Sequence, residues 1–279
     1  MSDDKTTLGA AQGAAKTLVQ AQFGANAAKY ATSAVHAKGA SLKRLVDLVG
    51  PQPEWAALDV ATGAGHTALA FAPHVATVIA SDLTPEMLVE AAKLAAERGL
   101  KNVSTAAADA EALPFADGTF DLVTCRIAPH HFPDIALFVS EVERVLKPGG
   151  TFAVVDNVAP DAETTPGFAK AALRDAGLTY NAFEKIRDPS HGRALTTAEW
   201  REIVSDARLA IGHVEHCPKA MDFGAWCSNM AVPAATVPKL AAMLDEASPA
   251  LAAFLQPTRD GDKRGFVLAE VILIAKKAE

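Results

Sequence analysis

Short apolar runs alternate with helical patterns along the middle of the chain. The apolar runs predict strands at residues 56–61, 75–81, 103–108, 120–125 and 151–156. Apolar residues at helical spacing predict helices between these strands, near 66–72, 85–98 and 133–146. The strands are apolar without alternation, as in sheets that are covered on both faces. This order of elements predicts an α/β protein with a parallel, doubly wound sheet.

Local signals mark the ends of two of these helices. Thr84 can cap the helix at 85–98, whose first helical position is Pro85 and whose C-terminal stop is Gly99. The helix near 133–146 is followed by Lys-Pro-Gly-Gly at 147–150. Proline and glycine in this order predict a turn before the fifth strand.

The segments on either side of this core are mainly helical. Residues 8–49 are rich in alanine, and Thr196 and Glu199 form a capping-box pattern ahead of Trp200. A strand near 209–217, helices to about 256 and a last strand at 266–275 indicate that the sheet continues across an inserted helical region. The predicted segments are N-terminal helices, an α/β core, a helical cap insertion and a C-terminal completion of the sheet, at 1–50, 51–158, 159–208 and 209–279.

Composition narrows the class of protein. Half of the 279 residues are apolar and the mean hydropathy is +0.13, which is enough to bury a core. The formal net charge of −7 makes nucleic acid a poor partner, and no apolar run reaches the length that spans a bilayer. The N-terminus has no secretory pattern, and three scattered cysteines without a C-x-x-C pair indicate a reducing compartment. These features predict a cytoplasmic protein.

The most informative segment joins the first predicted strand to its helix. Gly63 and Gly65 follow Asp59 and fit a tight turn that a ligand approaches closely. Asp82 ends the second strand, 19 residues after Gly63 (82 − 63 = 19), where a carboxylate can accept both hydroxyls of a ribose. Asp109 follows the third strand, where it can accept a hydrogen bond from an adenine amino group. As alternatives, Asp82 caps the next helix and Asp109 is an ordinary turn residue.

These residues occur in one order with other motifs. The whole set is residues 59–67, Asp82, Asp109, the segment 113–121 and Leu-Lys-Pro-Gly-Gly at 146–150. It resembles the class I methyltransferases that use S-adenosylmethionine (SAM), in the branch of the ubiquinone/menaquinone methyltransferases. The resemblance is strongest over residues 22–157. Through residues 187–191 and the last strand it extends to a group of bacterial methyltransferases with largely unassigned substrates.

The resemblance implies a fold and a set of cofactor residues. The fold is a Rossmann-like, seven-stranded, mostly parallel sheet whose last strand, 266–275, is antiparallel. The cofactor would be SAM, used to methylate a small-molecule acceptor. The residues implied to hold it are Asp59, Ala61, Gly63, Gly65, Asp82, Leu83, Met87, Asp109, Ala110 and Arg126.

Charge also favours SAM over a dinucleotide. SAM has no pyrophosphate, so its loop does not need to hold a phosphate at a helix N-terminus. Its sulfonium and amino group are cationic. An acidic strand end such as Asp59 therefore suits SAM and would repel a diphosphate.

Two groups of residues on the acceptor side follow from helix spacing and strand order. Tyr30, Ser33 and His36 share one face of an N-terminal helix that looks like a lid in the resembling group; a half-buried helix face is the alternative. His130 and His131 follow the fourth strand at the edge where ligands bind. Because adjacent side chains point in different directions, we expect one of them, His131, to reach the acceptor.

A third group lies in the cap. The loop 187–193 contains Asp188 and His191, either of which can act as a base, and Arg193, which can bind an acidic acceptor. A salt-bridged loop that anchors the cap is the alternative. Trp226 can add an aromatic wall to the acceptor pocket or belong to the core. The predicted catalytic residues are thus His191, Asp188 and His131.

A metal site is not predicted. His213, His216 and Cys217 offer three ligand types, but on a strand the odd separation places the two histidines on opposite faces. The expected partners are a small-molecule methyl acceptor and, as the candidate oligomer, a homodimer; no nucleic acid and no membrane span are expected.

Three rival functions remain open. An NAD-dependent oxidoreductase can use the same glycine turn, but the only tyrosines are Tyr30 and Tyr180 and no Tyr-x-x-x-Lys pair is present. A SAM-binding protein without methyl transfer would have the same cofactor residues. A nucleic-acid methyltransferase is disfavoured by the acidic charge, and because Ile-Ala-Pro-His stands at 127–130 instead of an Asn-Pro-Pro-Tyr motif.

Overall fold

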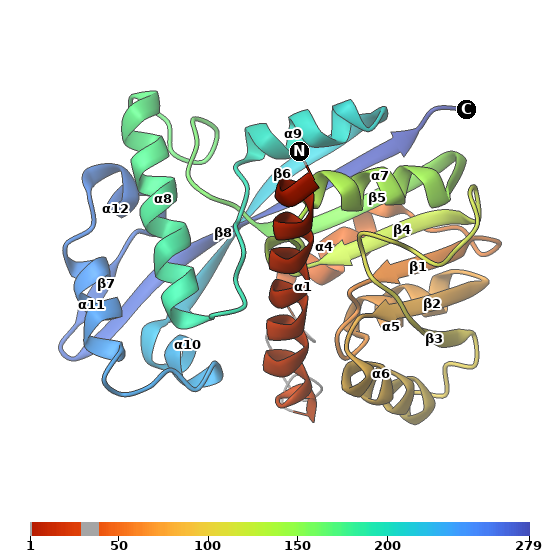
Figure 1. The fold of residues 1–279 in the computed structure, drawn as a ribbon, viewed down its shortest axis with the longest axis horizontal. Helices are drawn as coiled ribbons and strands as arrows, with labels where there is room; N and C mark the ends of the chain where they lie inside the picture. Colours follow the sequence, from red (N-terminus) through yellow and green to blue (C-terminus); the bar gives the residue numbers. More distant parts are fainter. Residues whose placement is uncertain (1, 29–38) are drawn as a thin grey trace.

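The computed structural model describes residues 2–28 and 39–279 (Figure 1). Its sheet has the order β3-β2-β1-β4-β5-β8-β6, and the short β7 pairs with β8. The strands are β1 (Ala56–Val60), β2 (Thr77–Asp82), β3 (Val103–Ala107), β4 (Phe120–Arg126), β5 (Leu146–Asn157), β6 (Leu209–Asp222), β7 (Thr258–Asp260) and β8 (Lys263–Lys277).

Helices connect the strands and build a separate cap. They are α1 (Ser2–Gly24), α4 (Ala40–Val49), α5 (His66–Phe71), α6 (Pro85–Glu97), α7 (Ile135–Val145), α8 (Lys170–Arg187), α9 (Thr197–Asp206), α10 (Phe223–Asn229), α11 (Val237–Asp245) and α12 (Pro249–Leu255). Two short 3₁₀ helices are η1 (Ala72–His74) and η2 (Pro129–His131). No helix in the described ranges is long and apolar enough to cross a bilayer.

Strands β1 to β5 are parallel, and β8 is antiparallel to both of its long neighbours, β5 and β6. The doubly wound sheet with an antiparallel last strand is therefore confirmed. The first four strands begin and end within about two residues of their predicted positions. Strands β1, β2 and β4 are mainly apolar and buried, whereas β3, at the edge of the sheet, is more exposed.

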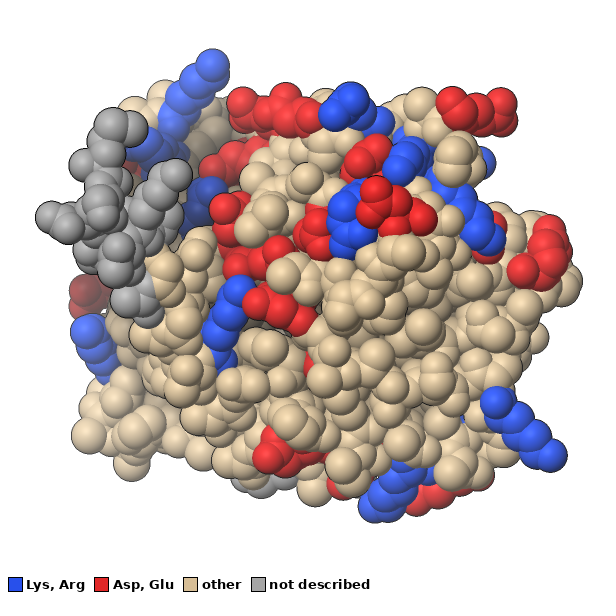
Figure 2. Space-filling view, turned by 45° about the vertical axis from the view of Figure 1, so that its right-hand side comes forward, with Lys and Arg blue, Asp and Glu red and all other residues tan. Residues whose placement is uncertain are grey.

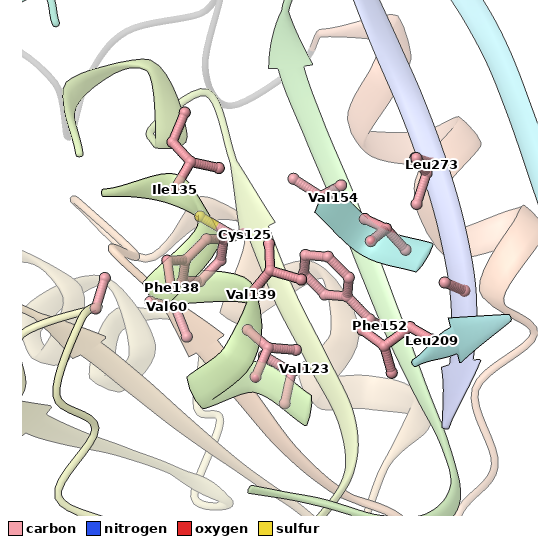
Figure 3. Packing of buried hydrophobic residues seen from close by; sticks show 14 of the residues in the cluster. Val60, Val123, Cys125, Ile135, Phe138, Val139, Phe152, Val154, Leu209 and Leu273 are labelled. Atoms are coloured by element: carbon pink, nitrogen blue, oxygen red, sulfur yellow. The ribbon is translucent and has the colours of Figure 1, made fainter. Parts of the chain in front are cut away.

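Alternate residues of the central strands enter two different cores. On one face, Val123 and Cys125 of β4 and Phe152 of β5 pack with Phe138 of α7 and with Leu273 of β8 (Figure 3). These side chains are fully buried, so this core packs α7 and the antiparallel strand β8 against the parallel part of the sheet.

The opposite face of the sheet packs under α4 and α5. Leu122 of β4 and Ala153 and Val155 of β5 lie in one buried cluster with Leu45 of α4 and Phe71 of α5. Since successive strand residues point to opposite faces, the central strands β1, β4 and β5 contribute to both layers.

The cap has a core of its own. Helices α8, α10, α11 and α12 pack around Phe266 and Leu268, near the start of β8. In Figure 1 the long β6 and β8 extend from the sheet into this cap, and α1 stands between the cap and the half of the molecule that contains β1, β2 and β3. Helix α9 instead packs on α7 and β6. Its start has the predicted capping box: Thr196 Oγ1 accepts from Glu199 N, and Glu199 Oε2 accepts from Thr196 N.

Two stretches differ from the prediction. Residues 147–150, predicted as a turn, belong to β5, where the pairing with β4 shifts from Phe120–Leu146 to Leu122–Thr151. The extra residues bulge from the ladder, and Gly149 has a φ of +74° there. Strand β6 is longer than predicted because its second half follows β8 into the cap. The division of the chain into four segments stays a prediction.

Candidate functional site

A cleft opens at the carboxyl ends of β1, β2 and β4, beside the glycine loop. It encloses about 1010 Å³, its open mouth included, which is at the upper end for small-molecule sites. Most of the predicted cofactor residues line it, namely Ala61, Gly63, Asp82, Leu83, Met87, Asp109, Ala110 and Arg126. Topology explains this gathering, because parallel strands end at the same edge of the sheet.

The two glycines of the loop have different roles. Gly63 lines the cleft with a φ of +54°, and a Cβ atom there would meet nothing within 4 Å. Gly65 does not line the cleft. Its φ is +87°, and a Cβ atom would lie 3.0 Å from Cβ of Ala91 on α6. Gly63 therefore serves the shape of the loop, whereas Gly65 lets the loop pack on a helix.

Asp82 connects the glycine loop to the start of α6. Its carboxylate accepts backbone N–H groups from Gly63 and Thr84, both at 2.8 Å, and burial raises its pKa against these hydrogen bonds. The prediction that the Thr84 side chain caps α6 is wrong, because that hydroxyl makes no capping bond. Asp82 thus fixes the start of the helix and also lines the cleft. Because a carboxylate offers about four acceptor positions, it can still accept hydrogen bonds from a ligand there.

Asp59 lies beneath the loop rather than in the cleft, and is 1% exposed. Its oxygens accept hydrogen bonds from Thr124 Oγ1 and Thr62 Oγ1, both at 2.6 Å, and from Ala68 N at 3.1 Å. Burial outweighs these bonds and raises the pKa of Asp59 to about 6. Its position makes it a support for the loop and a source of negative charge below it.

Helix α1 closes one side of the cleft over Asp109. Lys16 Nζ lies 2.6 Å from carboxylate oxygens of both Asp109 and Glu111. Burial lowers the pKa of Lys16, but the two carboxylates outweigh it and raise the pKa above its usual value. Gln20 donates to the carbonyl of Leu83 at 2.8 Å, so α1 is bonded both to the segment after β2 and to the segment after β3.

Arg126 enters the cleft from the end of β4. Its Nε donates to Thr67 Oγ1 at 3.1 Å. Burial lowers the pKa of its guanidinium, while the negative charges of Glu270 and Asp59 act in the opposite direction. Thr67 therefore fixes the guanidinium, and the two nearby negative charges favour its charged form.

The two histidines of η2 have opposite environments. His130 Nδ1 lies 2.5 Å from Asp156 Oδ1, and this carboxylate outweighs burial and raises the pKa of His130. His131 lines the cleft, and its Nδ1 lies 3.1 Å from the carbonyl oxygen of Ser190. Burial and the neighbouring His130 lower the pKa of His131 to about 3. Of the two, His131 lines the cleft and His130 does not. That His131 reaches the acceptor stays a prediction.

The cap loop reaches this histidine pair but not the cleft itself. Gly192 and Arg193 donate their backbone N–H groups to the carbonyl of His130, at 2.8 and 2.9 Å. A Cβ on Gly192 would lie 2.9 Å from that oxygen, so glycine allows the close approach. His191 does not line the cleft; it bonds Asn181 Oδ1 at 2.9 Å.

The remaining cap candidates have structural contacts. Arg193 pairs with Glu199 at 2.6 Å and stays partly exposed on the start of α9. Trp226 is 1% exposed, stacks on Phe183 at 4.6 Å and carries the guanidinium of Arg187 over its ring. Neither lines the cleft, so the structure places both with the alternatives: a salt bridge beside the cap and a core tryptophan.

Comparison with known proteins fits this geometry. A family model described as a methyltransferase domain matches residues 58–154. YcgJ of Bacillus subtilis, named an uncharacterized methyltransferase, is 36% identical over 226 residues, which cover 81% of this chain and 85% of that protein. The chain belongs to the class I methyltransferases.

Solved structures extend the likeness of this methyltransferase over most of its length. The crystal structure of B. subtilis YcgJ has a TM-score of 0.78 at 33% identity and covers 86% of this chain and 98% of that one. A candidate methyltransferase from Bacillus halodurans has a TM-score of 0.79 at 34% identity, covering 86% and 100%. A demethylmenaquinone methyltransferase of Thermus thermophilus is 40% identical over 116 residues, 41% of this chain and 52% of its own length. The predicted family is confirmed.

Some site residues of the methyltransferase were not found from its sequence. Lys16 and Phe23 of α1 line the cleft, and Ser190 and Asp156 hold the two histidines. An isolated lysine in an alanine-rich helix carries no signal of its partner, because its carboxylates are 93 and more residues away. Tyr30, Ser33 and His36, predicted to form a lid, lie outside the described residues.

The histidines of β6 turn to separate partners. His213 Nε2 lies 3.0 Å from Glu215 Oε2, and His216 Nε2 lies 2.8 Å from Thr197 Oγ1. The pairing of β6 with β8 shifts between Ile211 and His213. Each ring is thus used in a local contact of the methyltransferase fold.

Proposed function

We propose that this methyltransferase takes its methyl group from SAM, bound in the cleft, and transfers it to a small-molecule acceptor. The observation that carries the proposal is Asp82. Asp82 is 8% exposed, ends β2 and lines the cleft, and two backbone N–H groups hold its carboxylate in place. A fixed carboxylate at this point suits the two ribose hydroxyls of an adenosine.

The charges around the cleft fit SAM. Asp82, Asp109 and Glu111 line it, and Asp59 adds a negative charge below it. Lys16 is engaged by two of these carboxylates. A cationic cofactor would be attracted to this region, whereas a pyrophosphate would be repelled. Leu83 and Met87 offer apolar surfaces for the adenine.

Bound SAM would supply an electrophilic methyl group on a sulfonium. Asp82 would orient the ribose by accepting its hydroxyl protons in hydrogen bonds, and the backbone at Ala61 and Gly63 would receive the methionine portion. Asp109 would accept from the adenine amino group. Val19 and Phe23 of α1 cover part of the cleft and would exclude water from the transfer.

The charges on the face shown in Figure 2 support a small acceptor. In Figure 2, Lys and Arg side chains lie among Asp and Glu side chains on the face shown, rather than forming one broad basic patch. Nucleic acid is bound mainly through such patches. The unpaired state of Cys125, Cys217 and Cys227 fits a reducing compartment such as the cytoplasm.

Calorimetry with the purified protein tests the cofactor. We expect SAM and S-adenosylhomocysteine to bind the wild type and NAD not to bind. Asp82→Ala should weaken SAM binding by at least about tenfold, because hydrogen bonds to a charged group are lost. Asp262→Ala, in the exposed hairpin between β7 and β8, is the matched control. A wild type that prefers NAD, or that ignores SAM, would overturn the proposal.

A further inference from the structure

His131 presents one ring nitrogen to the cleft and the other to the cap. Its Nδ1 lies 3.1 Å from the carbonyl oxygen of Ser190. Nε2 makes no hydrogen bond to the described part of the chain. This atom is also not fully buried, so a ligand in the cleft can approach it. The ring therefore spans from the cap loop to the ligand side.

The contact with Ser190 selects the tautomer. A carbonyl oxygen only accepts hydrogen bonds, so the proton of the neutral ring must be on Nδ1. Burial and the nearby His130 keep the pKa of His131 low, at about 3, and the ring is neutral near pH 7. Nε2 then carries an available lone pair directed away from the cap.

Asp188 fixes Ser190, and Ser190 in turn fixes the imidazole ring of His131. Oδ1 of Asp188 accepts from Ser190 N at 2.8 Å and from Ser190 Oγ at 2.5 Å. With its own proton donated to Asp188, the Ser190 hydroxyl can accept from His131 Nδ1, 3.3 Å away. Asp188 is 5% exposed and Ser190 is equally buried, so this chain of contacts is built into the interior.

The neighbouring His130 makes the assignment specific. Its ring centre lies 4.2 Å from that of His131, yet His130 is bound to Asp156 on the far side from the cleft. The pKa values of these two adjacent imidazoles therefore shift in opposite directions: the carboxylate of Asp156 raises that of His130, whereas burial and the neighbouring His130 lower that of His131. Titratable neighbours whose pKa values are pushed apart are a common feature of acid–base sites.

The surroundings of Nε2 define the acceptor. The cleft residues near His131 are apolar: Phe23, whose ring lies edge-on at 5.0 Å, and Ile127, Ala128, Phe132 and Pro133. The cations of the described lining are both engaged, Lys16 by carboxylates and Arg126 by Thr67. This environment suits an uncharged, apolar body and offers little to an anionic one.

We propose that His131 is the general base of the reaction and that the acceptor is an apolar molecule bearing a phenolic or enolic hydroxyl. The acceptor oxygen forms a bond to the methyl carbon, and the carbon–sulfur bond breaks with its electron pair remaining on sulfur. The hydroxyl proton passes to Nε2 of His131. The products are a methyl ether, S-adenosylhomocysteine and an imidazolium, which later loses its proton to water. Ser190 and Asp188 are positioning residues. This inference rests on the proposed use of SAM.

The low basicity of His131 is compatible with this role. As the new carbon–oxygen bond forms, the acceptor oxygen becomes oxonium-like and its proton becomes far more acidic than in the free hydroxyl. A neutral imidazole can then take the proton during the transfer, without first generating a free anion. The positive charge moves from the sulfonium to the ring, so the acidic cleft keeps the same net charge.

The test combines a probe reaction with a measurement on the ring. We would follow methyl transfer from SAM to 2-naphthol, measuring 2-methoxynaphthalene and S-adenosylhomocysteine, with 2-naphthoate as an anionic probe of similar size. His131→Phe removes the base and keeps an aromatic ring against Phe23, His131→Gln is a second variant, and His213→Gln on β6 is the control. Nitrogen-15 NMR of the wild type with S-adenosylhomocysteine reports which nitrogen of His131 is protonated.

The expected results separate this inference from the cofactor proposal. Wild type should methylate 2-naphthol and not 2-naphthoate. His131→Phe and His131→Gln should lower kcat by about 100-fold or more while calorimetric SAM affinity stays within about twofold. Asp188→Asn should lower kcat with little change in KM and should shift the nitrogen-15 resonance of His131 Nδ1.

Three results would overturn it. SAM binding without any methylation of 2-naphthol would reject the acceptor class. Unchanged turnover in both His131 variants would reject the base, and a proton found on Nε2 would reject the tautomer. If the wild type does not bind SAM, the proposed function fails first, and this inference fails with it.

Discussion

Replacing Asp59 by asparagine is expected to stabilise the fold at pH 7 and to weaken SAM binding. The pKa of Asp59 is raised by burial from 3.8 to about 6. At 1.36 kcal/mol per pKa unit, the charged form is disfavoured in the folded protein by roughly 3 kcal/mol. The wild type bears this cost at neutral pH because the carboxylate is ionised.

Asparagine fits the same hydrogen bonds with one change. Its oxygen can take the place of Oδ2 and accept from Thr62 Oγ1 and Ala68 N. Its NH₂ then faces Thr124 Oγ1, which must turn from donor to acceptor. Weaker bonds to the neutral amide cost about 1 kcal/mol, so the variant should be more stable at pH 7 by about 2 kcal/mol.

The stability difference between Asp59→Asn and the wild type should reverse its sign in acid. A carboxyl with a raised folded pKa binds its proton in the folded state before the unfolded state does, so the contribution of Asp59 to wild-type stability rises as pH falls from about 6 to 3.8. Asparagine lacks this gain. The difference between the variant and the wild type should therefore shrink and cross zero at roughly pH 4–5.

Thermal and urea unfolding between pH 4 and pH 8 measure this difference. We expect Asp59→Asn to raise Tm by roughly 4–8 °C at pH 7, with exposed Asp206→Asn unchanged. Calorimetry should show several-fold weaker SAM binding, because a cationic cofactor loses a negative charge below the loop. A variant that is less stable than the wild type at pH 7, or a difference that does not vary with pH, would refute the reasoning.

Other substitutions test the packing around the cleft. Gly65→Ala should lower the free energy of unfolding by about 2 kcal/mol or more, since its positive φ is combined with a 3.0 Å contact to Ala91. Gly63→Ala should lower it by only about 1 kcal/mol, because only the strain of the positive φ applies, and urea unfolding compares the two variants. Lys16→Gln should speed amide exchange in α1 by at least about tenfold without lowering global stability much, because two ion pairs are lost at a half-open site. Thr196→Ala should lower stability by about 1 kcal/mol through loss of its cap; equal stability in thermal unfolding would contradict this.

Much of the cofactor half followed from local pattern. The central strands are mainly apolar, and in a parallel sheet such runs are buried between helices. The carboxyl ends of β1, β2 and β3 then meet at one edge, which brings Gly63, Asp82 and Asp109 together from distant parts of the chain. Periodicity and strand order are thus sufficient to place these residues.

Local pattern was less informative where two roles compete at one position. Thr84 is a residue type that often caps helices, but its side chain makes no capping bond to α6. Its backbone N–H is bound by the carboxylate of Asp82. Asp59 was expected at the methionine portion and lies below the loop, since its strand position points it toward α5. In both cases the role of the residue depends on which neighbour lies closest to it in the fold.

The acceptor side depended on contacts between distant segments. His191 and His131 are equally suited to a base by residue type. The cap loop returns to η2 through two backbone bonds to His130, and this turns His191 toward Asn181 and leaves His131 facing the cleft. Helix α1 reaches Asp109 across 93 residues of chain.

The sequence by itself determined the doubly wound sheet, the glycine loop and the carboxylates at its edge, because these depend on short-range periodicity and on the fixed geometry of parallel strands. The tertiary structure alone decided which histidine lines the cleft, which carboxylate stays buried and where α1 lies. Those outcomes depend on desolvation and hydrogen-bond partners, which are set by packing between residues far apart in the chain.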